Sequence, residues 1–274
     1  MAWVLRGLRD GIVTTPYPRR PDGYGPNYRG AVEVANHPGG SDSTRPEGLD
    51  EASLSALCPT GAIESATGID DQRGLRLDRG RCILCGRCVD AVPARFAFTP
   101  MVETAAVGRA GLVVPPDVED DAALDRLRRQ LHKRVKALRR SIHVRHVDAG
   151  SDGAEEWEVS ALLNPVYDVQ RLGIYFTATP RHADVLLATG VGTAGMAGPL
   201  QRTYEAMPEP KVVVAAGADA TSGGLVHPSY TAGPGIASIV PVDVWVPGSP
   251  PSPFSLLHGI LLGIGLLPAP KAEP

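Results

Sequence analysis

The sequence has no long apolar run, few aromatic residues and only four cysteines in 274 positions. No run reaches the roughly 18 apolar residues of a membrane-spanning helix. The longest candidate, residues 254–267, contains His258 and three glycines, so a buried terminal helix is the better interpretation. The net charge of −3 and the 5% aromatic content argue against a general nucleic-acid-binding surface. We therefore look for function in the few cysteines that are present.

The cysteines follow a pattern typical of an iron–sulfur site. Cys58 is followed by proline, and Cys82, Cys85 and Cys88 form a C-x-x-C-x-x-C run. A triplet with a remote Cys-Pro is how bacterial-type ferredoxin domains bind a [4Fe-4S] cluster, and soft thiolates suit iron–sulfur chemistry. We expect these four residues to ligate one [4Fe-4S] cluster, which leaves no thiol for a second.

Two other uses of four cysteines are open at this point. A structural zinc site usually joins two short hooks of cysteine or histidine rather than a triplet and a remote residue. Two disulfides would need an oxidising compartment, and no secretory signal peptide is evident. The pattern favours the cluster over both alternatives.

The ferredoxin pattern is also incomplete in an ordered way. A two-cluster ferredoxin would have further ligands ten, seven and four residues before Cys58, and a Cys-Pro four residues after Cys88. The residues found there are Gly48, Glu51, Leu54 and Val92. Because these positions make up the complete ligand set of the other cluster, the segment resembles a ferredoxin fold that retains one cluster of two.

We predict an α+β ferredoxin-like N-terminal domain followed by an α/β flavodoxin-like domain with a parallel sheet. The expected organisation is an extended arm at 1–30, the ferredoxin-like domain at 31–116, a connecting helix at 117–141, the second domain at 142–267 and a disordered tail at 268–274.

Local patterns support this division. Apolar residues recur at helical spacing within 118–140, and the stripe consists of Leu124, Leu127, Leu131, Val135 and Leu138. Short strands are expected at 62–64 and 75–77. Beyond residue 142 apolar strands alternate with a helix, as in parallel sheets. Strands are predicted at 142–147, 185–188, 211–216 and 239–246, with a helix at 195–207.

The second domain resembles the small subunit of energy-converting [NiFe] hydrogenases and the related subunit of complex I. The likeness is in residues 164–174 (NPVYDVQRLGI), 178–184 (ATPRHAD), 239–243 (IVPVD) and 246–251 (VPGSPP). The N-terminal part resembles the ferredoxin-like subunit of formate hydrogenlyase and hydrogenase-4 complexes, through residues 11–18 (GIVTTPYP), 28–30 (YRG) and 80–88 (GRCILCGRC). The chain is thus similar to a fusion of two neighbouring subunits of one complex.

The resemblance also identifies a departure. The small subunits of that family bind a proximal [4Fe-4S] cluster through four cysteines, and here the matching positions hold Asp152, Glu155, Asp219 and Ser249. Hard oxygen donors are a poor set for such a cluster. They could surround Mg²⁺ or another hard cation, bind a basic loop of a partner, or simply fill and solvate the space. Three converging carboxylates would raise one another's pKa unless a cation is present.

The resemblance implies a non-catalytic, electron-transfer iron–sulfur subunit of a membrane-associated oxidoreductase complex, hydrogenase-like or complex I-like. Its implied partners are a hydrogenase-like large subunit, other subunits of that complex and a soluble electron donor, but no nucleic acid. The implied location is cytoplasmic, at the inner face of the cell membrane through the complex. One alternative is a docking subunit whose second domain has lost its redox function. Another is a metal enzyme built on the oxygen donors.

Overall fold

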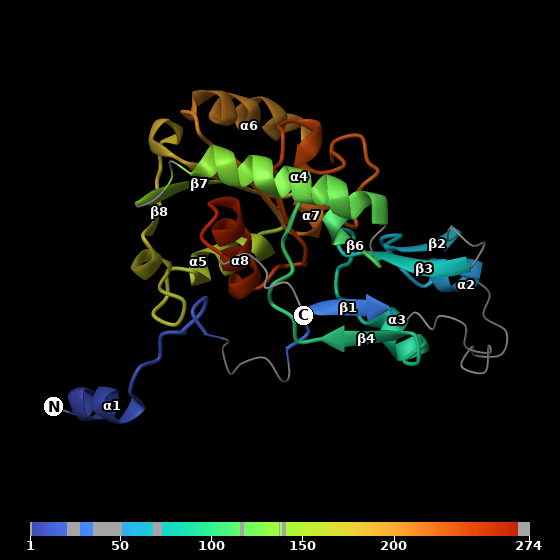
Figure 1. Ribbon diagram of the computed structural model, residues 1–274, viewed down its shortest axis with the longest axis horizontal. Helices are drawn as coiled ribbons and strands as arrows, with labels where there is room; N and C mark the ends of the chain where they lie inside the picture. The colour runs from blue at the N-terminus through green and yellow to red at the C-terminus, as the bar shows by residue number, and fades with distance from the viewer. Residues whose placement is uncertain are drawn as a thin grey trace.

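The computed structural model describes residues 2–20, 28–34, 51–67, 73–115, 118–136, 138 and 141–267. These residues form a large region built on one six-stranded sheet and a small region with a two-stranded and a three-stranded sheet (Figure 1).

The large region is organised by a mostly parallel sheet in the order β5-β11-β10-β9-β7-β8. Its strands are β5 Ala106–Val107, β7 Ile142–Asp148, β8 Ile174–Phe176, β9 Val185–Thr189, β10 Val212–Ala216 and β11 Val244–Val246. All neighbours run parallel except β5, which pairs antiparallel with β11. The two central strands β9 and β10 are buried along their whole length, as expected for a sheet covered on both faces.

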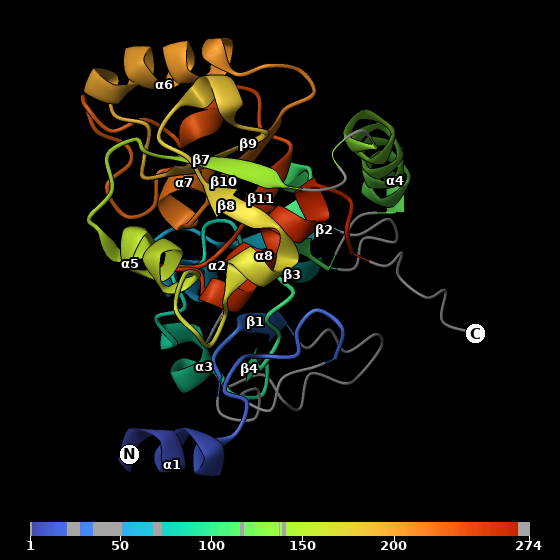
Figure 2. The ribbon, with the colours of Figure 1, turned by 90° about the vertical axis from the view of Figure 1, so that its left-hand side faces the viewer.

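Helices cover both faces of this sheet. Figure 2 shows α6 (Ala194–Ala206) on one side and α5 (Ala154–Ala161) and α8 (Pro253–Gly263) on the other. Leu256, Leu257 and Ile260 of α8 are fully buried in the core, so the predicted buried terminal helix is confirmed. Within the described ranges no helix is long and apolar enough to cross a membrane.

The large region also has a further short α-helix, α7 (Ala218–Ser222). Its short 3-10 helices are η2 Arg109–Leu112, η3 Val169–Leu172, η4 Pro180–His182 and η5 Ile236–Ser238. The long helix α4 (Val118–Val135) packs on the large region through Leu124, Leu131 and Val135.

The small region contains the cysteines. Its elements are β1 Ala31–Val34, α2 Glu51–Ala56, β2 Ile63–Thr67, β3 Arg73–Asp78, α3 Arg87–Ala91, β4 Phe96–Thr99 and β6 Val113–Val114. β1 pairs with β4, and β3 pairs with both β2 and β6, all antiparallel. Leu75, Leu77 and Phe96 are buried in its own small core. The ferredoxin-like assignment of this region stays a prediction.

Several predicted elements need shorter bounds. The helix predicted over 118–140 ends at Val135, and Leu127 of the predicted stripe is 43% exposed. The strand predicted over 239–246 is reduced to β11, because Pro241 has no N–H to give to a sheet and interrupts the run. The other predicted strands of the large region and the helix at 195–207 are confirmed within two residues.

The N-terminal arm is partly helical and attaches to the large region. Residues 2–10 form α1, which lies apart from the body of the molecule, so this part of the arm is not extended as predicted. Thr14 Oγ1 and the Thr15 N–H then donate to the carbonyls of Pro165 and Val166, both at 2.8 Å. The predicted tail at 268–274 lies outside the described residues.

Candidate functional site

The structure brings the four predicted cysteines together. Cys58 follows α2, Cys82 and Cys85 lie in the loop between β3 and α3, and Cys88 is in the first turn of α3. All four line one small cavity, with Val32, Ile63 and Leu77 on its apolar side. Four cysteines from two segments of chain therefore line one cavity next to the core of the small region.

The surrounding backbone is suited to thiolates. The Ala62 N–H donates to Cys58 Sγ at 3.2 Å, and Thr60 Oγ1 lies 3.4 Å from the same sulfur. Leu84 and Gly86 have φ values of 55° and 79°, the left-handed conformation that turns the chain between the ligands of the triplet. Hydrogen bonds to cluster sulfurs are one way in which a protein sets a cluster's reduction potential.

Mutual repulsion of the thiols would be relieved by a cationic centre. The pKa of Cys82 is raised to about 12, chiefly by burial; the neighbouring Cys88, Cys58 and Cys85 contribute to this rise, and the Leu84 N–H opposes it. Burial likewise raises the pKa of Cys88. Metal coordination deprotonates thiols outright, so this donor set fits a bound group that supplies positive charge.

The arrangement also separates the alternatives for these cysteines. All four are free thiols, so the structure has no disulfide between them. In the described ranges, no group of three or more His, Cys, Asp or Glu is placed to hold one metal ion. A four-cysteine zinc site would need all its ligands on a single ion, whereas a [4Fe-4S] cluster takes one thiolate on each of four irons. The choice between zinc and the cluster stays a prediction.

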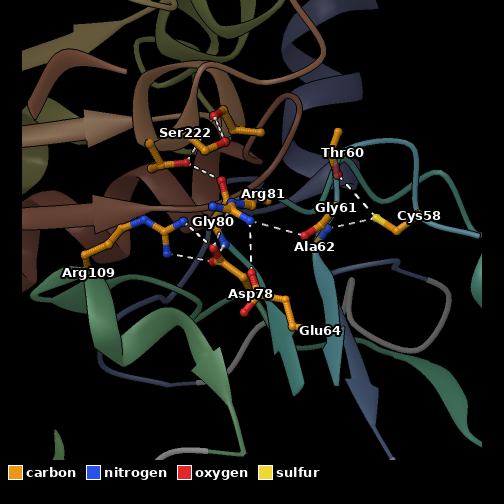
Figure 3. A network of polar contacts seen from close by, with 12 residues as sticks. Cys58, Thr60, Gly61, Ala62, Glu64, Asp78, Gly80, Arg81, Arg109 and Ser222 are labelled. Atoms are coloured by element: carbon orange, nitrogen blue, oxygen red, sulfur yellow. Dashed lines mark hydrogen bonds and ion pairs between the residues drawn. The ribbon is translucent and has the colours of Figure 1, made fainter. Parts of the chain in front are cut away.

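An ion-pair network fixes the loop that precedes the triplet (Figure 3). Asp78 is 8% exposed and accepts from Arg109 through both carboxylate oxygens, at 2.6 and 2.5 Å. Asp78 Oδ1 also accepts from the Gly80 N–H at 2.9 Å. Arg81 lies 3.5 Å from Asp78 and donates to Glu64 at 3.0 Å. Bidentate charge-assisted pairs are rigid as well as strong, so this network orients the chain that enters Cys82.

The thiol site, by which we mean Cys58, Cys82, Cys85 and Cys88 with the loop that precedes the triplet, contacts the large region at two points. Thr221 Oγ1 in α7 donates to the carbonyl of Gly80, the glycine labelled in Figure 3. Cys82 and Leu84 line a second, narrow cavity together with Pro247 and Gly248, from the loop between β11 and α8. A cluster on the thiols would thus lie beside the loop in which Ser249 stands.

Three of the four remaining predicted positions are carboxylates that interact with one another next to this loop. Asp152 precedes α5, Glu155 is in the first turn of α5, and Asp219 is in the first turn of α7. The pKa of Glu155 is raised to about 7, chiefly by burial; the repulsion of Asp219, Asp152 and Glu156 contributes to this rise, and its own N–H opposes it. Burial first, and then Asp152 and Glu156, raise the pKa of Asp219. We use the name carboxylate pocket for Asp152, Glu155 and Asp219 together.

Glycines make room for these carboxylates. A Cβ at Gly217 would lie 2.5 Å from Glu155 Oε1, and one at Gly224 would overlap Asp219 Oδ1. Ser249 is exposed, and no described side-chain contact joins it to the carboxylates. Only its loop is tied to α7, because the Ala218 N–H donates to the Gly248 carbonyl at 2.6 Å.

Sequence reasoning missed the polar neighbours of this pocket. Glu156 accepts from Ser151 Oγ at 2.6 Å and from Thr189 Oγ1 at 2.5 Å, and lies 3.6 Å from His146 Nε2. Burial lowers the pKa of His146, which favours its neutral form. The sequence signal was the position of His146 and Thr189 near the carboxyl ends of adjacent parallel strands. Ser151, Thr189 and His146 thus contact Glu156 and not the neighbouring Glu155.

Comparison with known proteins gives a consistent family. Residues 153–262 match the family described as NADH ubiquinone oxidoreductase, 20 Kd subunit. Formate hydrogenlyase subunit 7 of Escherichia coli (strain K12) is 40% identical over 157 residues, which cover 57% of this chain and 60% of that protein. The probable membrane-bound hydrogenase subunit mbhJ of Pyrococcus furiosus is 40% identical over 141 residues, which cover 50% of this chain and 84% of that protein.

A solved structure is also similar. A chain of the membrane-bound sulfane sulfur reductase, described as an archaeal respiratory membrane complex, matches with a TM-score of 0.40 and 30% identity, over 48% of this chain and 70% of that one.

The large region therefore defines the class: an α/β subunit with a mostly parallel sheet, similar to subunits of formate hydrogenlyase and membrane-bound hydrogenase. The chain belongs to the family of the 20 Kd subunit of NADH ubiquinone oxidoreductase.

Proposed function

We propose that this chain is the electron-transfer subunit of a membrane-associated complex of the hydrogenase or complex I kind. It would carry one [4Fe-4S] cluster on Cys58, Cys82, Cys85 and Cys88. The observation that carries the proposal is the convergence of these four thiols on one cavity, in a chain whose large region belongs to that family. A cluster bound there would supply one-electron redox chemistry.

The chain's own residues would position that group and insulate it. Cys58, Cys82, Cys85 and Cys88 would be its ligands. The Ala62 N–H would donate to the ligand sulfur of Cys58, and Val32, Ile63 and Leu77 would keep water from one side. The chain would make no bond to a substrate.

The carboxylate pocket bears on where the electron goes. We propose that the chain is a fusion whose second domain has lost the proximal cluster, so that Asp152, Glu155, Asp219 and Ser249 stand where four cysteines would be. No thiol remains there to relay an electron from the small region. The expected partner is a large subunit that has also lost its nickel site, and its gene should lack paired C-x-x-C motifs. Intact motifs in that gene would count against this part of the proposal.

A second candidate function is docking. The carboxylate pocket and the bond between Thr221 and Gly80 favour a large region that binds partner subunits and holds the small region against them. The complex would lie at the cytoplasmic face of the membrane, with the chain attached to it peripherally through other subunits and reduced by a soluble donor or a partner's clusters.

Iron and acid-labile sulfide on anaerobically purified protein separate the two functions. The electron-transfer proposal expects about four irons per chain and a reduced-state EPR signal of a single cluster. About eight irons per chain would contradict the proposal that the large region has lost its cluster. No iron would leave docking as the function.

A further inference from the structure

The carboxylate pocket has negative charge that the described residues do not neutralise. Asp152, Glu155 and Asp219 interact with one another. In the part of the chain that the structure describes, no lysine or arginine forms an ion pair with any of the three. Glu156, the fourth carboxylate nearby, accepts hydrogen bonds from Ser151 and Thr189 and lies beside His146. The carboxylates without such partners are therefore the three of the carboxylate pocket.

A separate observation indicates that a donor is missing. Glu155 is 1% exposed, and its Oε2 is a buried atom with no hydrogen-bond partner among the described residues. A buried carboxylate oxygen without a donor costs stability, and such atoms are rare in native proteins unless another group completes them. Neither α5 nor α7, which contribute the pocket residues, supplies that group.

The chemistry of the missing group can be narrowed. Among the described residues, the three carboxylates, from the start of α5 and the loop before it and from α7, are not placed to hold one metal ion. A guanidinium has five N–H donors in one plane and can serve several carboxylates at once. Asp152 is exposed and Asp219 half-buried, so an entering side chain would meet them before it reached Glu155.

The surroundings point to a protein as the source. Leu225 and Val226, which directly follow Gly224 against Asp219, are 60% and 55% exposed. Apolar side chains next to a charged group that needs a partner are typical of protein interfaces, where arginine is enriched.

We propose that the carboxylate pocket accepts an arginine side chain from a partner subunit that covers the start of α5, α7 and residues 224–226. The guanidinium pairs with Asp152 and Asp219 at the entrance and donates to Glu155 behind them. The positive charge thus enters where the family resemblance places a cluster. The inference rests on the proposed function only in assuming a multisubunit complex, and it does not depend on whether the thiols hold iron.

The first test uses the isolated chain with ethylguanidinium as the probe. Carboxyl carbons of labelled glutamate and aspartate are followed by NMR through a pH titration. A bound cation favours the carboxylate, so ethylguanidinium should lower the apparent pKa of Glu155 by about half a unit, a threefold change in proton affinity. Tetramethylammonium at the same concentration has the charge without N–H donors and serves as the control for screening.

Three outcomes overturn the proposal in this test. Equal shifts with both cations would indicate general screening. A shift with Mg²⁺ alone would indicate a metal site. An undiminished ethylguanidinium effect in Asp219→Asn would place the cation elsewhere.

The second test uses the complex from its native membrane, purified through a tag on this chain. Glu155→Gln and Asp219→Asn should lower, at least twofold, the salt concentration at which the partner subunits dissociate, while Glu205→Gln on exposed α6 should leave it unchanged. Glu155→Gln removes a buried charge and should stabilise the isolated chain, so weaker association cannot be ascribed to unfolding. Wild-type salt resistance in both pocket variants would overturn the proposal. Loss of iron in every sample would instead contradict the electron-transfer function alone.

Discussion

The thiol site and the carboxylate pocket both adjoin the loop at Pro247 and Gly248, and they differ in how many of their polar groups have partners within the chain. Around the thiols, the Ala62 N–H donates to Cys58 Sγ, the Thr60 hydroxyl lies beside the same sulfur, and a bidentate ion pair fixes the entering loop. In the pocket, burial and the neighbouring Asp219 and Asp152 raise the pKa of Glu155, and its buried Oε2 has no described donor. If the proposals above hold, the first site takes a group that its four ligands hold by themselves, whereas the second takes a positive charge from another molecule.

The largest expected effect comes from removing a thiol. Cys82→Ser should reduce iron from about four per chain to nearly none, because a cubane needs all four thiolates. Iron and sulfide assays with EPR measure this. Thr60→Ala, which removes only a hydroxyl near Cys58, is the matched control and should retain the cluster. Full iron content in Cys82→Ser would contradict the proposal that the four thiols ligate a cluster.

The ion pair that supports the thiol site should come next. Arg109→Met leaves the buried Asp78 without its bidentate partner and should lower the free energy of unfolding by about 3 kcal/mol, since a buried carboxylate is then poorly compensated. Urea denaturation measures it. Arg128→Met breaks an exposed pair with Asp125 and should cost under about 0.5 kcal/mol. Similar losses in the two variants would mean that the network adds no special rigidity.

The pocket should respond with the opposite sign. Burial raises the pKa of Glu155 from 4.5 to about 7, so the folded state favours the protonated form. Wild-type stability should therefore fall as the pH rises from about 4.5 through 7. Glu155→Gln should be more stable above pH 7 by up to about 3 kcal/mol, and the gain should vanish near pH 4.

Thermal and urea unfolding across pH measure this difference, with Glu205→Gln as the control at an exposed site. A gain that is independent of pH would show that the benefit of Glu155→Gln is not electrostatic.

The smallest expected effect concerns the contact between the two sites. Thr221→Val removes the hydroxyl that donates to the Gly80 carbonyl and should cost about 1 kcal/mol, a typical buried hydrogen bond. Ser222→Ala removes a half-buried hydroxyl whose described hydrogen bonds, to Ala218 and Gly224, both stay within the large region, and it should cost less. If iron is lost faster from Thr221→Val than from Ser222→Ala, the large region helps to hold the thiol loop in place.

Sequence reasoning reached the parts of the fold that local pattern determines. Continuous apolar runs predicted β9 and β10, and alternation with helices predicted the parallel sheet. It missed β5 and β8, whose two and three residues carry no periodic signal of their own and pair only because the sheet is already there. It extended β11 through Pro241 because apolar composition outweighed the missing N–H.

The sites divide in the same way. The spacing of the cysteines was enough to bring four thiols to one cavity. The convergence of Asp152, Glu155 and Asp219 came from a resemblance, since these residues are dispersed along the chain. Nothing local signalled Arg109 as the partner of Asp78, or Thr221 as the partner of Gly80, because those pairs lie 31 and 141 residues apart.

The chain passes repeatedly between the two regions. Thr15 binds the large region, β1 belongs to the small one, β5 joins the large sheet and β6 returns to β3 before α4 begins. Each region is therefore built from several separate segments of the chain, so that cleavage at a single peptide bond would not separate the two regions. Nicked between β6 and α4, the protein should run as one particle under native conditions.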